Sequence, residues 1–217
     1  MQKGKIHPIK QLISQGEHVH LDFKFEISDA PKIARSLSAF ANTEGGKLLV
    51  GVKDNGTIAG ISSEEEHFMI DQAAKLYCHP EVEFKSKEWV IAGKKVLEIT
   101  VPKSEFPPHR APDMQGNYKA YYRLADQNVL AHGIQIKVWK KLTDETAVVI
   151  VYNEVVKTVL SVIEQQTRVN FETLRTMINL SKHNLEELLS DLVVMQVISM
   201  KITENQLLFY LASDETK

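Results

Sequence analysis

The stretch EGGKLLVGVKDNG, at residues 44–56, limits the fold more than any other part of this 217-residue chain. Its centre, LLVGV, is a short apolar run of the kind typical of a buried strand. Gly45 and Gly46 precede the run, and an Asp-Asn-Gly turn signal follows it at 54–56. Upstream, apolar residues between 33 and 41 recur at helical spacing. We therefore predict a helix that ends at the glycines and reverses directly into a buried strand.

A Gly-Lys pair such as Gly46-Lys47 also occurs in the phosphate-binding loops of nucleotide-binding proteins. Such a loop needs a glycine five residues before the pair and a serine or threonine after it, but this chain has Ala41 and Leu48 there. The turn also lies between a helix and a strand, which is the reverse of the order that places a phosphate on a helix N-terminus. No nucleotide-binding loop is predicted.

The remaining residues up to 142 show helical and strand patterns without a regular βαβ repeat. The predicted elements are a helix at 8–13, a strand at 17–27, a helix from Ser62 or Ser63 to Tyr77, a hairpin about Gly93 and a strand at 117–124. This mixture predicts an α+β domain over residues 1–142, with a mixed sheet and flanking helices.

Residues 143–217 are predicted to form a second, smaller domain. A helix, a turn, another helix and two short β segments follow one another, which is the order of a winged helix-turn-helix. The second of these helices is acidic, with Glu186, Glu187 and Asp191. Because phosphate contact along that helix would be repulsive, we predict that residues 146–217 mediate association into a homo-oligomer rather than DNA recognition.

The formal net charge of −2 is divided unevenly along the chain. Residues 1–142 contain 20 lysines and arginines against 17 acidic residues, whereas residues 143–217 contain 6 against 11. A polyanion is therefore expected to bind the first part. There, Lys24, Arg110, Lys119 and Arg123 are the predicted phosphate contacts. The single cysteine, the polar N-terminus and the absence of a long apolar segment favour a cytoplasmic protein without membrane contact.

Three carboxylates, Glu17, Asp22 and Asp54, would meet at one sheet edge if their strands are neighbours. Such an oxygen-rich cluster suits Mg²⁺ or Mn²⁺ and hence phosphodiester hydrolysis. An unbroken strand would send Glu17 and Asp22 to opposite faces, so they converge only if Glu17 lies in a turn. The alternative is three solvated acids at strand ends. His18 and His20 are a weaker candidate pair for a transition metal.

Three blocks, EHVHLDFK, AFANTEGGKLLVGVKDNGTIAGI and AYYRLADQNVLA, resemble in this order the Alba-like domain of the Schlafen group. The resemblance covers roughly residues 10–135 and is most specific in the middle block. It implies nucleic-acid binding, because bacterial members are described as DNA-binding transcriptional regulators. Vertebrate relatives include metal-dependent endoribonucleases, whose three catalytic acids correspond here to Glu17, Asp22 and Asp54, with Lys24 beside the second.

Two departures from the family pattern weaken the nuclease hypothesis. Asp22 stands where the family usually has glutamate, which shortens the reach of the carboxylate, and Ala125-Asp126 replaces a common Gly-Ser. We therefore predict a cytoplasmic regulator that binds DNA rather than RNA and requires no cofactor. A Mg- or Mn-dependent endoribonuclease is the first alternative, and a protein-interaction scaffold is the second.

Overall fold

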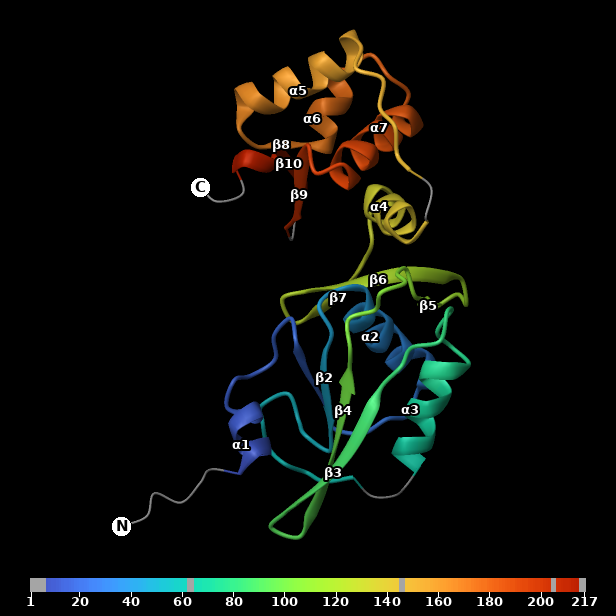
Figure 1. Cartoon of the computed structure of the whole chain (residues 1–217). Helices are drawn as coiled ribbons and strands as arrows, with labels where there is room; N and C mark the ends of the chain where they lie inside the picture. The colour runs from blue at the N-terminus through green and yellow to red at the C-terminus, as the bar shows by residue number, and fades with distance from the viewer. Residues whose placement is uncertain (1–6, 62–64, 145–146, 204–205, 215–217) are drawn as a thin grey trace, which may run out of the picture. The chain divides into compact units, whose positions relative to one another are not determined.

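The computed structural model describes residues 7–61, 65–144, 147–203 and 206–214 (Figure 1). The chain divides into two compact units, Met1–Leu130 and Ala131–Lys217. The division predicted from the sequence lies after residue 142. The structural division comes earlier because the helix that follows Leu130 packs on a helix of the second unit. The predicted α+β class is confirmed.

The first unit is built on a four-stranded mixed sheet. Its strands are β1 (Leu21–Lys24), β2 (Gly46–Val50), β3 (Lys85–Ile91) and β4 (Lys94–Val101), in the order β1-β2-β4-β3. β1 runs parallel to β2, whereas β4 is antiparallel to both β2 and β3. The apolar run predicted as a buried strand begins in β2, which lies between β1 and β4, and Leu48, Leu49 and Val50 are buried on both faces of the sheet.

Helices cover both faces of this sheet (Figure 1). α2 (Ala30–Asn42) and α3 (Glu65–Lys75) pack on one face, and the short α1 (Pro8–Ile13) packs on part of the other. The core on the α2 side includes Leu48, Val50, Leu97 and Ile99, and the core on the α1 side includes Leu21, Phe23, Leu49 and Val96. The predicted start of α3 at Ser62 or Ser63 lies outside the described residues.

The connection from α2 to β2 requires glycine at its last residue, Gly45, and at the first residue of β2, Gly46. Gly45 has a φ of +71°, and a Cβ atom there would lie 2.7 Å from the carbonyl oxygen of Val101. A Cβ atom at Gly46 would overlap the ring of Phe40. The predicted reversal from helix to strand is therefore confirmed, and its cause is close packing as well as backbone conformation.

A second, three-stranded sheet packs against α2. It consists of β5 (Arg110–Pro112), β6 (Tyr118–Leu124) and β7 (Gln127–Leu130). Buried Asn42 joins the two parts: its Nδ2 donates to the carbonyl oxygens of His109 and Tyr121, both at 2.8 Å, and its Oδ1 accepts from the backbone N–H of His109 at 2.7 Å. This cross-link gives the asparagine of the AFANTEGG block a structural role that the sequence analysis did not identify.

β1 is shorter than the strand predicted at residues 17–27. Its regular pairing covers only four residues, and His18 instead closes a tight turn through two backbone hydrogen bonds with Leu21. Phe25, which the alternation assigned to the core, is 48% exposed. Glu17 consequently lies in the turn before the strand, which was the condition for it to approach Asp22.

The second unit has the predicted winged helix-turn-helix order. It contains α4 (Gly133–Thr143), α5 (Glu154–Gln166), β8 (Val169–Asn170), α6 (Phe171–Met177), α7 (Lys182–Val194), β9 (Ile198–Ile202) and β10 (Leu207–Leu211). β10 pairs with both β8 and β9. Ser181 caps α7 as expected, since its Oγ accepts from the backbone N–H of Asn184 at 3.2 Å.

Residues 147–153, before α5, belong to no helix or strand. Three apolar side chains in this segment are largely exposed: Val149 at 81%, Val151 at 75% and Tyr152 at 70%. Thr146, where the predicted association region begins, lies outside the described residues. In the part of the chain that the structure describes, no helix is long and apolar enough to cross a bilayer.

Candidate nucleic-acid interface

Arg123 and Asp22, predicted as a phosphate contact and a metal ligand, form a buried charge pair with each other. The side chains are 1% and 6% exposed, and Arg123 Nη1 lies 3.9 Å from Asp22 Oδ1. The guanidinium also donates to Asn128 Oδ1 at 3.0 Å and to the carbonyl oxygen of His18 at 3.1 Å, and it lies 4.8 Å from the centroid of the Phe40 ring. Its donors point into the protein, so this arginine does not present a cation to a phosphate.

Glu17 approaches the same pair from the turn before β1. Its Oε1 accepts a hydrogen bond from the backbone N–H of Phe23 at 2.8 Å. Burial raises the pKa of Glu17 and the neighbouring Asp22 carboxylate raises it further, which outweighs the lowering by the Phe23 N–H and the charge of Lys24. Two of the three predicted carboxylates are therefore neighbours.

The third carboxylate, Asp54, is exposed in the turn that follows β2. Among the residues that the structure describes, no three His, Cys, Asp or Glu side chains are grouped so as to hold a metal ion. A cation already lies beside Asp22, because Lys24 Nζ is 2.9 Å from its Oδ2. This arrangement does not fit the Mg²⁺ or Mn²⁺ site that the nuclease alternative requires.

The other predicted phosphate contacts do not form one patch. Lys24 donates from Nζ to the carbonyl oxygen of Phe23 at 2.7 Å, and 27% of its side chain remains exposed. Arg110 in β5 and Lys119 in β6 belong to adjacent pairs of the strand register, so their side chains point to opposite faces of that ribbon. Lys119 is exposed and Arg110 is half-buried.

The surplus of positive charge in residues 1–142 does not belong to the first unit. Lys137, Lys140 and Lys141 account for the whole surplus, and all three lie in α4 of the second unit. Residues 1–130 contain 17 lysines and arginines and 17 acidic residues. The net charge of the first unit therefore gives no reason to expect that it binds a polyanion. Such binding depends on how the cations of the unit are distributed over its surface.

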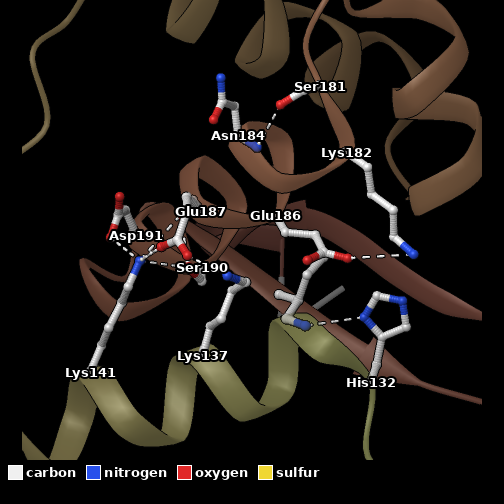
Figure 2. A network of polar contacts seen from close by, with 11 residues as sticks. His132, Lys137, Lys141, Ser181, Lys182, Asn184, Glu186, Glu187, Ser190 and Asp191 are labelled. Carbon is white, nitrogen blue, oxygen red and sulfur yellow. Dashed lines mark hydrogen bonds and ion pairs between the residues drawn. The ribbon is translucent and has the colours of Figure 1, made fainter.

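The lysines of α4 neutralise the acidic face of α7 (Figure 2). Lys141 Nζ lies 2.7 Å from Glu187 Oε2 and 2.6 Å from Asp191 Oδ1, and Lys137 pairs with Glu187 as well. Hydrogen bonds from Lys137 and Lys141 lower the pKa of Glu187 to about 2. This face of α7 is therefore covered by α4 and is not open to DNA.

Two family models match the chain. The Schlafen, AlbA_2 model matches residues 17–132, and the PCI domain model matches residues 130–211. This chain belongs to the Schlafen AlbA_2 family. The AlbA_2 match coincides with most of the first unit, and the part that is similar to a PCI domain coincides with the winged-helix-like second unit.

Two solved structures are distantly similar to this AlbA_2 protein. The DIP2311 protein from Corynebacterium diphtheriae is 18% identical, with a TM-score of 0.44; the match covers 76% of this chain and only 31% of that one. The N-terminal domain of a RecG-related protein from Nitrosomonas europaea is 17% identical, with a TM-score of 0.37, over 69% of this chain and 97% of that one. No curated protein matches the chain.

Proposed function

We propose that this AlbA_2 protein binds nucleic acid through its first unit, with DNA preferred to RNA, and acts as a transcriptional regulator. The observation that carries the proposal is the family match over residues 17–132, which lie almost wholly in that unit. Binding of this kind consists of cation contacts with the sugar-phosphate backbone and requires no cofactor.

The contacts within the second unit support the assignment of nucleic-acid binding to the first unit. A helix that enters a DNA groove needs free donors toward base edges and phosphates. The acidic face of α7 is instead paired with Lys137 and Lys141 of α4. We accordingly assign nucleic-acid binding to the first unit and protein association to the second. Lys24, Arg110 and Lys119 remain proposed phosphate contacts, and Arg123 is withdrawn from that set.

Salt dependence of binding by the full chain tests this function. Fluorescence anisotropy is measured with single-stranded DNA, duplex DNA and RNA of mixed sequence, at roughly 50 to 200 mM salt. The logarithm of the association constant should fall linearly with the logarithm of salt concentration, with about 0.9 of slope for each duplex phosphate contacted. Affinity should depend little on sequence. Absence of salt-sensitive binding to all three probes would refute the proposal.

We also propose that residues 146–217 join copies of the chain into a homo-oligomer. The support is the exposed apolar side chains of Val149, Val151 and Tyr152, because such a cluster is a common mark of a protein contact. The solution mass of the full chain should exceed that of one subunit, and Val151→Asp should reduce it. Val90→Asp, at a valine of the first unit that is 63% exposed, is the matched control and should leave the mass unchanged.

A further inference from the structure

The strand register of the first unit places four lysines on one face of the sheet. Lys47 and Lys85 both pair with Thr100, Lys87 pairs with Glu98, and Lys94 pairs with Ile91. Paired residues share a face and side chains alternate along a strand, so all four lysines project from the side on which α1 packs. We call Lys47, Lys85, Lys87 and Lys94 the lysine face.

One carboxylate accompanies these four cations. In β2, β3 and β4, every residue of which the structure describes, Glu98 is the acidic residue on this side of the sheet. Burial alone would raise the pKa of Glu98, but hydrogen bonds from Lys47 and Trp89 and the charges of Lys47 and Lys87 hold it below its ordinary value. Glu98 is therefore ionised at neutral pH, and four lysines against one carboxylate leave three positive charges.

The opposite side of the same hairpin is balanced. There, Lys95 Nζ lies 3.2 Å from Glu88 Oε2. Since the first unit as a whole carries equal numbers of cationic and acidic residues, the surplus on the lysine face is a local separation of charge. A polyanion is attracted to such a local surplus of positive charge even when the net charge of the unit is zero.

The lysine face is accessible to a ligand. Lys85, Lys87 and Lys94 are exposed, because α1 covers the apolar part of this side and not the lysines of β3. The Lys87 ammonium lies 3.7 Å from the centroid of the Trp89 ring, and this cation–π contact favours the observed position of the side chain. Lys85 and Lys87 are two residues apart on one strand, and hence about 7 Å apart along it.

A groove of about 350 Å³ adjoins Lys47 and the paired Thr100. Its lining includes His18, His20 and Lys103, besides the backbone of the glycine turn. Lys103 is paired with Glu44 at 2.8 Å. The groove continues the basic surface with polar side chains, and the carboxylate in its lining, Glu44, is the one paired with Lys103.

We infer that the lysine face is the surface through which the first unit holds the sugar-phosphate backbone of a nucleic acid. The inference rests on the proposed nucleic-acid function and replaces the scattered cations Lys24, Arg110 and Lys119 as its principal contacts. Ammonium groups on a rigid sheet neutralise phosphates without selecting bases. The lysine face therefore contributes affinity and salt dependence, with little sequence preference.

Protection of the sheet edge is a second role for these lysines, and it leads to a different experimental result. β3 is the edge strand of the sheet, and lysines on an edge strand discourage pairing with other chains. Protection of an edge does not depend on which face bears the charge, whereas Lys85 and Lys87 share one face. If edge protection were their whole role, their loss would cause aggregation and would leave the salt dependence of binding unchanged.

The test measures the salt dependence of duplex DNA binding by full-length variants. Lys85→Gln with Lys87→Gln removes two cations and retains most of each side-chain stem. The magnitude of the slope should fall by about 1.8. The matching arginine variant, Lys85→Arg with Lys87→Arg, should retain the wild-type slope. Thermal melting and far-ultraviolet circular dichroism check that each variant is folded.

Two further variants distinguish the possible failures. Lys75→Gln with Lys95→Gln makes the same change in charge away from the lysine face and should leave the slope unchanged. Arg110→Gln with Lys119→Gln tests the alternative contacts. A slope reduced only by this last pair, or equally by all three pairs, would overturn the lysine-face inference and leave nucleic-acid binding intact. Failure of the wild-type chain to bind any nucleic acid would instead refute the proposed function, and the inference with it.

Discussion

Replacement of Arg123 by alanine should lower the free energy of unfolding of the first unit. Its effect should come from this loss of stability and not from the loss of a phosphate contact. The guanidinium is enclosed by Asp22, Asn128, the His18 carbonyl oxygen and the ring of Phe40. Its removal leaves the Asp22 carboxylate in a site where the side chain is 6% exposed, with Lys24 as the remaining cation beside it.

The expected loss is a large part of the stability of a small unit. Removing one member of a buried ion pair costs about 3 to 5 kcal/mol, because the other charge stays buried. Lys24 Nζ still lies 2.9 Å from Asp22, which places the estimate for Arg123→Ala at the lower end, about 3 kcal/mol. The total free energy of unfolding of a domain of this size is about 5 to 15 kcal/mol.

Urea unfolding followed by tryptophan fluorescence measures this change. A Trp139→Phe background leaves Trp89, which belongs to the first unit, as the only tryptophan. Asp22→Asn with Arg123→Ala completes a double-mutant cycle, and residues in contact of this kind couple by about 0.5 to 3 kcal/mol. Arg110→Ala is the control at a half-buried arginine and should change stability by about 0.5 kcal/mol or less.

The result that would refute this explanation is a stable Arg123→Ala variant with weakened nucleic-acid binding. A loss below about 1 kcal/mol would mean that the buried pair contributes little. A reduced salt slope in the same variant would then return Arg123 to the set of phosphate contacts.

Two other predictions concern polar contacts, one in each unit. Asn42→Ala removes three hydrogen bonds of 2.7 to 2.8 Å and should destabilise the first unit by about 3 kcal/mol in the same assay, whereas Asn55→Ala at an exposed turn should cost about 1 kcal/mol or less. In the second unit, the pKa of Glu187 is lowered to about 2, so its stabilisation is present above the unfolded pKa of about 4.3 and is lost as the pH falls toward 2. Glu187→Gln should therefore cost about 1 kcal/mol at pH 7, after allowance for solvent screening, and less at pH 3; a difference independent of pH would contradict this account.

Local patterns predicted most of the fold because their causes are local. The glycines before β2, the apolar run of β2, the hairpin about Gly93 and the Ser181 cap each act within a few residues. The strand predicted at 17–27 was too long because the tight turn at His18 depends on backbone hydrogen bonds, and polar alternation continues through it unchanged.

The site was predicted less well because its geometry depends on contacts between distant segments. Arg123 lies 101 positions from Asp22 in the sequence and was assigned to the surface as a cation. One available signal was its position in AYYRL, directly after two tyrosines that are also buried. A single charge in such an apolar run favours a buried cation, which needs a buried acid, and Asp22 between Leu21 and Phe23 has the matching pattern.

For nucleic-acid binding, the position of each cation matters more than the net charge of a segment. The three lysines that gave residues 1–142 their surplus lie in α4, and two of them pair with Glu187 and Asp191. The slope of the association constant with salt concentration reports how many phosphates are neutralised by cations at the interface. A cation that is already paired within its own unit contributes little to this slope. The strand register of β3 and β4, by contrast, concentrates lysines on one side of a unit that is neutral overall. The expected affinity of this AlbA_2 protein for a polyanion therefore follows from the face on which each lysine lies, and the net charge of neither unit predicts it.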